Sequence, residues 1–146
     1  MTVTYREHEL PNGLRISAEI DPAAETAAAG FFVRSGARDE PSEYMGISHF
    51  LEHMVFKGTQ DHSGEAFDEA FDELGLHHNA WTSHEITAFH AHGLPGVLSN
   101  GIDLLSELMQ PALRDDDLED ERHVIIEEIA MYEDQPFWQL WERVSG

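Results

Sequence analysis

The sequence predicts an α+β fold in which a largely antiparallel sheet packs against helices. Three observations support this prediction. The chain has 146 residues, which is about the size of one domain. Hydrophobic residues make up 41% of it, enough to bury a core. Candidate strands and helices come in clusters and not in strict alternation, which favours antiparallel pairing.

The candidate strands form two groups. The turn sequence Pro11-Asn12-Gly13 separates the first two strands and predicts a β-hairpin. Short runs with strand-like patterns lie at residues 5–10, 14–20, 27–34, 77–82 and 85–92.

Four segments have the pattern of helices. Phe67, Phe71 and Leu74 recur at spacings of four and three, with acidic residues between them, which is typical of an amphipathic helix. Gly58 and Gly75 follow two of these segments and can end them. The predicted helices span residues 45–56, 64–74, 94–109 and 115–133.

The charge of the chain excludes several classes of partner. Asp and Glu number 29 against 8 Lys and Arg, a formal net charge of −21. This charge repels phosphate backbones and anionic lipid surfaces, so we expect no nucleic-acid or membrane partner. The chain has no cysteine, so any metal site must use His and carboxylate ligands. The N-terminus lacks the apolar stretch of a signal peptide, and we therefore expect a cytoplasmic location.

The segment His49-Phe50-Leu51-Glu52-His53 is the main candidate for chemistry. On a helix, its two histidines and Glu52 fall within an arc of about 100°. Two imidazoles four residues apart can bind one metal ion, and the carboxylate then lies near metal-bound water. The string alone would arise by chance with a probability of roughly 0.1, so its context matters. The alternatives are a polar helix face without a metal, and a structural zinc site, which usually has four protein ligands and mostly thiolates.

A catalytic zinc site needs a third protein ligand, and the last predicted helix offers one. Glu121 and Glu128 are seven residues apart. They share a helical face with an apolar stripe that includes Ile125 and Ile129. Because a carboxylate in an apolar stripe is costly to bury unless it is paired or metal-bound, we favour Glu128 as the ligand and Glu121 as the partner that holds a ligating histidine. Glu127, on the side that looks solvated, remains an alternative ligand. A fully solvated acidic helix is a further alternative.

Together these stretches resemble the pitrilysin/insulinase family of inverted-zincin metallopeptidases, called M16. The matching segments, spread over nearly the whole chain, are LPNGLRI, FFVRSGARDE, GISHFLEHMVFKGT, LGLHHNAWTSHEITAFHA and ERHVIIEEIAMYEDQP. The resemblance implies His49, His53 and Glu128 as ligands of one Zn²⁺ ion and Glu52 as the general base. It also implies that Glu121 supports the site.

The resemblance further implies a zinc-dependent endopeptidase that hydrolyses extended or unfolded peptides. Bound peptide would pair with an edge strand formed by Asn79, Ala80, Trp81 and Thr82. The alternative for this segment is an edge strand without a ligand. As a whole, the chain could instead be a non-catalytic peptide-binding or scaffold subunit, or an inactive fragment that needs its second half.

The family implies a larger organisation than these 146 residues. A homologous second half, or a second subunit, closes over the catalytic half. We therefore expect residues 1–146 to form a LuxS/metallopeptidase-like half-domain that is incomplete at its C-terminal end. Trp138 and Trp141, in the apolar segment after Pro136, fit a core or interface whose partner elements lie elsewhere.

The remaining histidines carry less information. His90 and His92 alternate onto one strand face with Ala88, but no spacing requires a second metal ion. We favour structural or solvated roles for six of them, which are His77, His78, His84, His90, His92 and His123.

Overall fold

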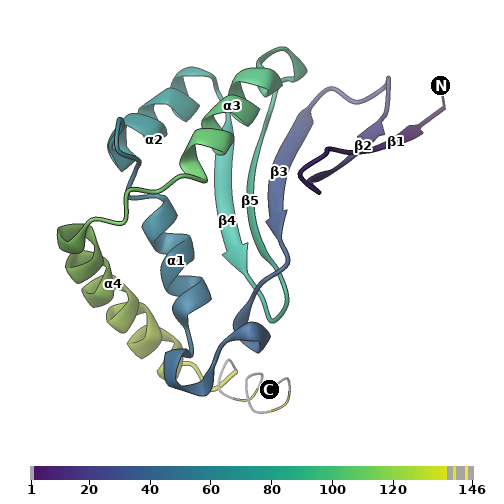
Figure 1. Ribbon diagram of the computed structural model, residues 1–146. Coiled ribbons are helices and arrows are strands. Elements are labelled where there is room, and N and C mark those ends of the chain that lie inside the picture. The colour runs from purple at the N-terminus through teal and green to yellow at the C-terminus, as the bar shows by residue number, and fades with distance from the viewer. Residues whose placement is uncertain (1, 138–139, 141–143, 145–146) are drawn as a thin grey trace.

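The fold is seen in a computed structural model that describes residues 2–137, 140 and 144 (Figure 1). The prediction made for Trp138 and Trp141 falls outside the described residues. The strands are β1 Thr4–Glu9, β2 Arg15–Ile20, β3 Ala27–Val33, β4 His77–Thr82 and β5 Thr87–Gly93. The α-helices are α1 Ile47–Val55, α2 Gly64–Glu73, α3 Leu98–Leu108 and α4 Asp115–Glu133.

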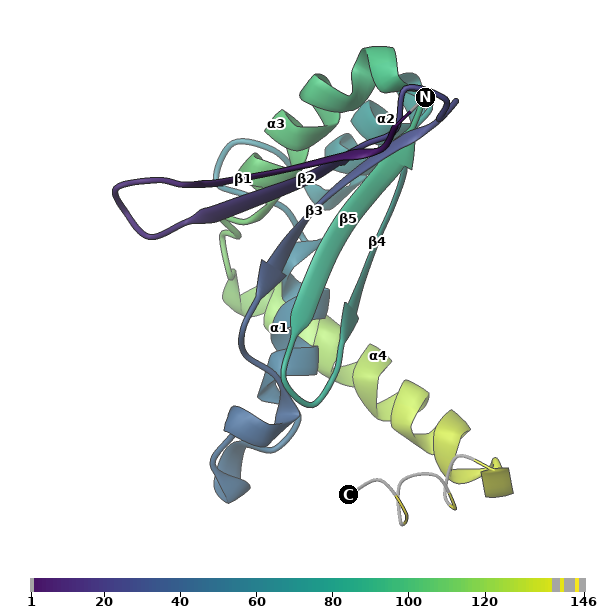
Figure 2. The same cartoon turned by 90° about the vertical axis from the view of Figure 1, so that its right-hand side faces the viewer.

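The strands form two antiparallel sheets. β1 and β2 make a hairpin, and β3, β5 and β4 make a three-stranded sheet in that order. The hairpin lies beyond β3, on the side of the sheet away from the helices (Figures 1 and 2). At its tip Gly13 has a φ of +87°, a conformation that glycine adopts without steric cost. The predicted α+β class and antiparallel pairing are confirmed.

The helices cover one face of the three-stranded sheet (Figures 1 and 2). α3 packs on β3 and β5, and α2 packs between α3 and β4. α1 contacts β4 on one side and α4 on the other, so α4 forms an outer layer beyond α1. Two helices that are distant in sequence, α1 and α4, are therefore neighbours in the fold.

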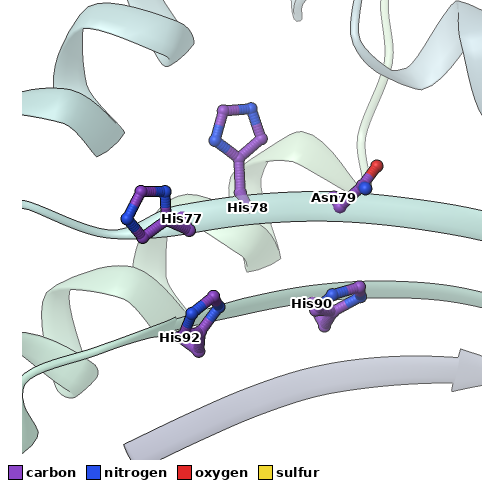
Figure 3. Close-up of a pocket in the computed structure, with 5 residues that line it drawn as sticks. All are labelled: His77, His78, Asn79, His90 and His92. Atoms are coloured by element: carbon purple, nitrogen blue, oxygen red, sulfur yellow. The ribbon is translucent and has the colours of Figure 1, made fainter. Parts of the chain in front are cut away.

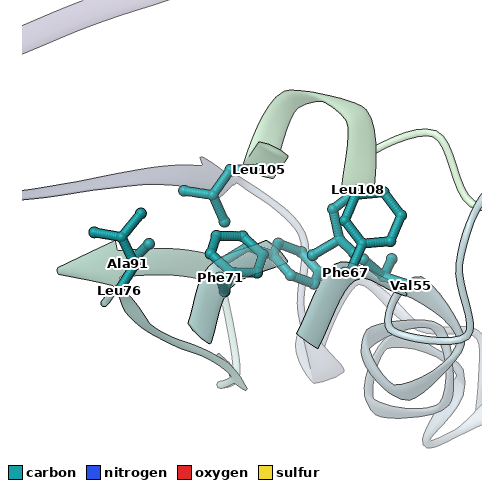
Figure 4. Close-up of a cluster of buried hydrophobic side chains, with 8 residues drawn as sticks. Val55, Phe67, Phe71, Leu76, Ala91, Leu105 and Leu108 are labelled. Atoms are coloured by element: carbon teal, nitrogen blue, oxygen red, sulfur yellow. The ribbon is translucent and has the colours of Figure 1, made fainter. Parts of the chain in front are cut away.

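The hydrophobic core lies between the sheet and α1, α2 and α3. Phe71 of α2 and Leu108 of α3 are fully buried. Their neighbours in the same cluster are Val55, Phe67, Leu76, Phe89, Ala91 and Leu105 (Figure 4). Val55 is the last residue of α1, so this cluster holds the C-terminal end of that helix against the sheet.

Three details differ from the sequence prediction. β5 begins at Thr87 and not at residue 85, because Ser83 and Ile86 close a turn in which the Ser83 N–H donates to the Ile86 carbonyl at 2.8 Å. The helix expected from residue 94 starts with a short 3₁₀ turn, Pro95–Val97, before α3. Ile129 of α4, expected in a buried stripe, is 52% exposed, because α1 covers only part of that face.

Candidate metal centre

The N-terminal end of α1 is fixed by an acidic side chain from the preceding loop. The Glu40 carboxylate accepts hydrogen bonds from the backbone N–H groups of Gly46 at 2.6 Å and Ser48 at 2.7 Å. Burial by itself would raise the pKa of Glu40, but these two hydrogen bonds favour the ionised form and the pKa is lowered overall. Glu40 thus satisfies N–H groups that the first turn of the helix leaves unpaired, and it fixes the helix that carries the two motif histidines.

The N-terminal end of α4 is fixed to the segment that follows α1. Arg114, the residue before α4, donates to the carbonyl of Thr59 and, at 3.4 Å, to the carbonyl of Lys57. The helix then starts with three aspartates, whose charges are favourable at a helix N-terminus. These contacts set where α4 starts relative to α1.

This packing brings together the three predicted ligands, His49, His53 and Glu128. The Nε2 atoms of the two histidines are 3.2 Å apart. The Oε2 atom of Glu128 lies 3.4 Å from Nε2 of His53 and 3.8 Å from Nε2 of His49. Ligand atoms about 2.0–2.1 Å from one tetrahedral ion are about 3.3 Å apart, so the triangle has the dimensions of a zinc site. Among the described residues, this is the group of three His or acidic side chains whose ligand atoms converge.

A second acidic residue of α4 orients one of the histidines. Nδ1 of His53 lies 2.7 Å from Oε1 of Glu121, and because an ionised carboxylate only accepts, the imidazole is the donor. This tautomer leaves the lone pair of Nε2 directed toward His49 and Glu128. A carboxylate that fixes the tautomer and direction of a ligating imidazole is a regular feature of zinc sites.

Glu121 is kept ionised despite being only 4% exposed. Its burial raises the pKa, but hydrogen bonds from Lys57 and His53, together with the charge of Lys57, outweigh burial and hold the pKa below its ordinary value. Lys57 pairs with the Oε2 atom while His53 occupies Oε1. No sequence pattern predicted a role for Lys57, although it is the one lysine of the chain and lies four residues after His53.

The remaining motif residue, Glu52, is also held in place. The hydroxyl of Thr82, the last residue of β4, donates to Oε2 of Glu52 at 2.5 Å. Thr82 was predicted only as part of a peptide-binding strand, and its contact with α1 was not expected. Glu52 and Thr82 are both half-buried.

The predicted peptide-binding segment coincides with β4. In the order β3-β5-β4, this strand is at the edge of the described sheet. Asn79 and Trp81 lie on the more exposed face of β4, with Trp81 43% exposed, whereas Ala80 packs against the core. The segment therefore adjoins α1 and leaves one strand edge unpaired within the described residues. Glu127, the alternative ligand, is exposed and lies outside the converging group.

Comparison with known proteins decides the family. The family model described as Insulinase (Peptidase family M16) matches residues 15–144. The chain belongs to this family of metallopeptidases. No helix among the described residues of this M16 chain is long and apolar enough to cross a membrane.

Individual relatives agree with this assignment. The chain is 39% identical over 132 residues to the uncharacterized zinc protease YmxG of Bacillus subtilis, covering 90% of this chain and 32% of the relative. It is 38% identical over 142 residues to the mitochondrial-processing peptidase subunit beta of Saccharomyces cerevisiae, covering 94% and 31%. The chain thus spans about a third of the length of these curated relatives.

Solved structures have the same fold. A protease from Helicobacter pylori matches with a TM-score of 0.89 and 27% identity, covering 96% of this chain and 34% of the other. Pitrilysin matches with a TM-score of 0.79 and 28% identity, covering 90% and 14%. The fold class expected from the sequence is therefore that of pitrilysin-like proteases.

Proposed function

We propose that this M16 chain carries the catalytic centre of a zinc-dependent endopeptidase. His49, His53 and Glu128 would hold a single Zn²⁺ ion, and the observation that carries the proposal is the triangle of their ligand atoms, with sides of 3.2, 3.4 and 3.8 Å. Relatives named zinc proteases support zinc as the metal. When bound, the ion would polarise the scissile carbonyl and lower the pKa of a water molecule.

Within this proposal, Glu52 is the general base. Its carboxylate accepts the proton of the attacking water and passes it to the nitrogen of the leaving amine. The hydroxyl of Thr82 fixes one carboxylate oxygen and leaves the other to accept the proton. Glu121 acts through His53, because it keeps the ligating nitrogen of that imidazole unprotonated and correctly directed.

The proposed substrate is an extended or unfolded peptide. β4, whose residues 79–82 are the predicted peptide-binding segment, is an edge strand next to α1, so a peptide could add to the sheet by main-chain hydrogen bonds. Such binding depends little on side chains and tolerates many sequences. The net charge of −21 would favour peptides with positive charge.

We further propose that the chain works together with a second homologous M16 half or subunit. The chain spans about a third of its curated relatives, and one of them is by name a subunit of a processing peptidase. Residues 1–146 are then the catalytic part of a larger enclosure. The cytoplasmic location expected from the N-terminus stays a prediction.

The test compares two variants of the complete gene product that carries this chain. Glu52→Gln should bind zinc like the wild type and lose peptide hydrolysis, whereas His53→Ala should lose both. Glu69→Gln, which makes the same charge change at an exposed position of α2, should change neither. Hydrolysis of an unstructured peptide is followed by mass spectrometry and bound zinc by atomic emission. Wild-type turnover by Glu52→Gln would refute the base, and tight zinc binding without cleavage by the wild type would favour a peptide-binding subunit.

A further inference from the structure

The face of the three-stranded sheet that is turned away from the helices carries a second group of potential metal ligands. His90 and His92 are two residues apart on β5, so their side chains project from the same face. His77 of β4 is paired directly with His92 in the sheet register. Figure 3 shows His77 and His92 side by side on neighbouring strands, with His90 farther along β5.

We propose that His77, His90 and His92 form a site for a late first-row divalent cation, of which Zn²⁺ and Ni²⁺ are the test ions. The site is separate from the centre between α1 and α4. Three imidazoles are a ligand set that suits zinc, nickel and copper, and disfavours magnesium and calcium, which take oxygen ligands.

Strand geometry places the three Cβ atoms close enough for side-chain rotation to bring the imidazoles to one ion, although their ligand atoms do not converge in the structure as those between α1 and α4 do. Directly paired residues have Cβ atoms about 4.5–5.5 Å apart, and diagonal neighbours are about 7–8 Å apart. The ring centroids of His77 and His92 are 5.2 Å apart, with 29° between the ring planes. Two imidazoles bound to one tetrahedral ion with bonds of about 2.0–2.1 Å have centroids about 5 Å apart. Rotation of the rings about their side-chain bonds, without backbone movement, would therefore turn this stacked pair toward a common ion.

The surroundings leave room for such rotation. Two small residues of β3 lie opposite the histidines of β5, because Gly30 is paired with His90 and Ala28 with His92. A Cβ atom added at Gly30 would come within 3.1 Å of the Cβ of His90, and the ring of Phe32 lies 3.4 Å from the same point, so no residue larger than glycine fits beside His90. A shallow cavity of about 480 Å³ lies against this part of the sheet, and the three histidines and Asn79 line it.

Two other polar side chains, Asn79 and His78, lie next to the three histidines of the proposed metal site. Asn79 is paired with His90 and lines the same cavity. Its amide oxygen accepts a hydrogen bond from the Ala80 N–H at 2.8 Å and, with its second lone pair, is a candidate for a fourth ligand or for a hydrogen bond to bound water. His78 also borders the cavity, but its ring stacks on Phe71 of α2 at 4.2 Å and pairs with Asp68. Its imidazole therefore points to the opposite face and is not part of the site.

The test is the number of Zn²⁺ ions bound per chain, measured by atomic emission after equilibrium dialysis against micromolar Zn²⁺ and repeated with Ni²⁺. The wild-type chain should bind two equivalents. The double variant His90→Ala/His92→Ala should bind one, and so should the single variant His77→Ala, which alters only an exposed side chain. His84→Ala, an exposed histidine of the turn between β4 and β5, should still bind two.

A second pair of substitutions separates this proposal from that of the catalytic centre. His49→Ala/His53→Ala should also bind one equivalent, and combining it with the β5 double variant should bind none. Far-ultraviolet circular dichroism of each variant checks that the fold is kept. If the wild type binds one equivalent that disappears with His49 and His53, the site on the sheet does not exist. If neither His77→Ala nor the β5 double variant lowers the stoichiometry, the proposal is equally overturned, whatever happens at the other centre.

Discussion

The buried carboxylate of Glu121 gives the sharpest prediction about the metal centre. Its Oε1 atom accepts from His53 and its Oε2 atom pairs with Lys57, and the residue is 4% exposed. Glu121→Gln keeps the shape of the side chain but removes its charge. The amide replaces one of the two carboxylate oxygens by an NH2 group, which donates, so the side chain can no longer accept from the imidazole at one position and from the ammonium group at the other. The variant should therefore hold the imidazole of His53 less firmly.

The expected loss follows from the role of such partners in zinc sites. Removing the residue that orients a ligating histidine usually lowers metal affinity 10–100-fold, which is about 1.4–2.7 kcal/mol. Replacing a ligand should cost more, so Glu128→Gln is expected to weaken zinc binding by more than Glu121→Gln. Glu127→Gln makes the same charge change at an exposed position next to the ligand and should leave the affinity unchanged.

Competition with a chromogenic zinc chelator measures the dissociation constants of the three variants, all on α4. The predicted order of affinity is wild type and Glu127→Gln together, then Glu121→Gln, then Glu128→Gln. An affinity of Glu121→Gln within twofold of the wild type would refute the orienting role. A loss of equal size in Glu127→Gln would show that net charge, and not the contact with His53, sets the affinity.

Three further predictions concern the base, the core and the start of α1. Thr82→Val removes the hydroxyl that donates to Glu52, and a hydrogen bond to a charged group is worth about 1.5–3 kcal/mol. This variant should therefore lower kcat at least about tenfold with zinc binding unchanged, whereas Thr82→Ser should stay near wild type. Equal kcat for both variants would contradict this role of Thr82. Leu105→Ala empties a buried position of the core and should lower the free energy of unfolding by about 2–5 kcal/mol in urea titrations, whereas the exposed Leu118→Ala should change it by much less. The pKa of Glu40 is lowered from its ordinary value of 4.5, so its ionised form stabilises the fold above that pH and this contribution is lost as the pH falls through the lowered pKa. Urea titrations from pH 7 to pH 3 should accordingly show Glu40→Gln less stable than the wild type at neutral pH with the gap closing in acid, and a gap independent of pH would count against the carboxylate.

The sequence predicted most of the fold because its patterns are local. The turn at Gly13 and the spacing of Phe67 and Phe71 identify elements that need no knowledge of their neighbours. The choice of Glu128 over Glu127 also followed from one helix, because the two side chains point about 100° apart. Glu127 is exposed in the structure and Glu128 is half-buried beside the two motif histidines.

Contacts between distant segments could not be predicted in the same way. The pairing of Lys57 with Glu121 joins residues that are separated in sequence by α2, β4, β5 and α3, and no helical pattern contains it. The hydrogen bond from Thr82 to Glu52 likewise depends on how α1 lies on β4. Ile129 is exposed for the same reason. A helical wheel predicts which residues share a face, but not how much of that face a neighbouring helix covers.

The position of the bound metal tests the central claim most directly. Crystals grown with Zn²⁺ give an anomalous difference map at the zinc absorption edge. We expect the strongest peak between α1 and α4, about 2.0–2.2 Å from Nε2 of His49, Nε2 of His53 and a carboxylate oxygen of Glu128. A strongest peak elsewhere, with these three side chains outside coordination distance of any ion, would contradict the account.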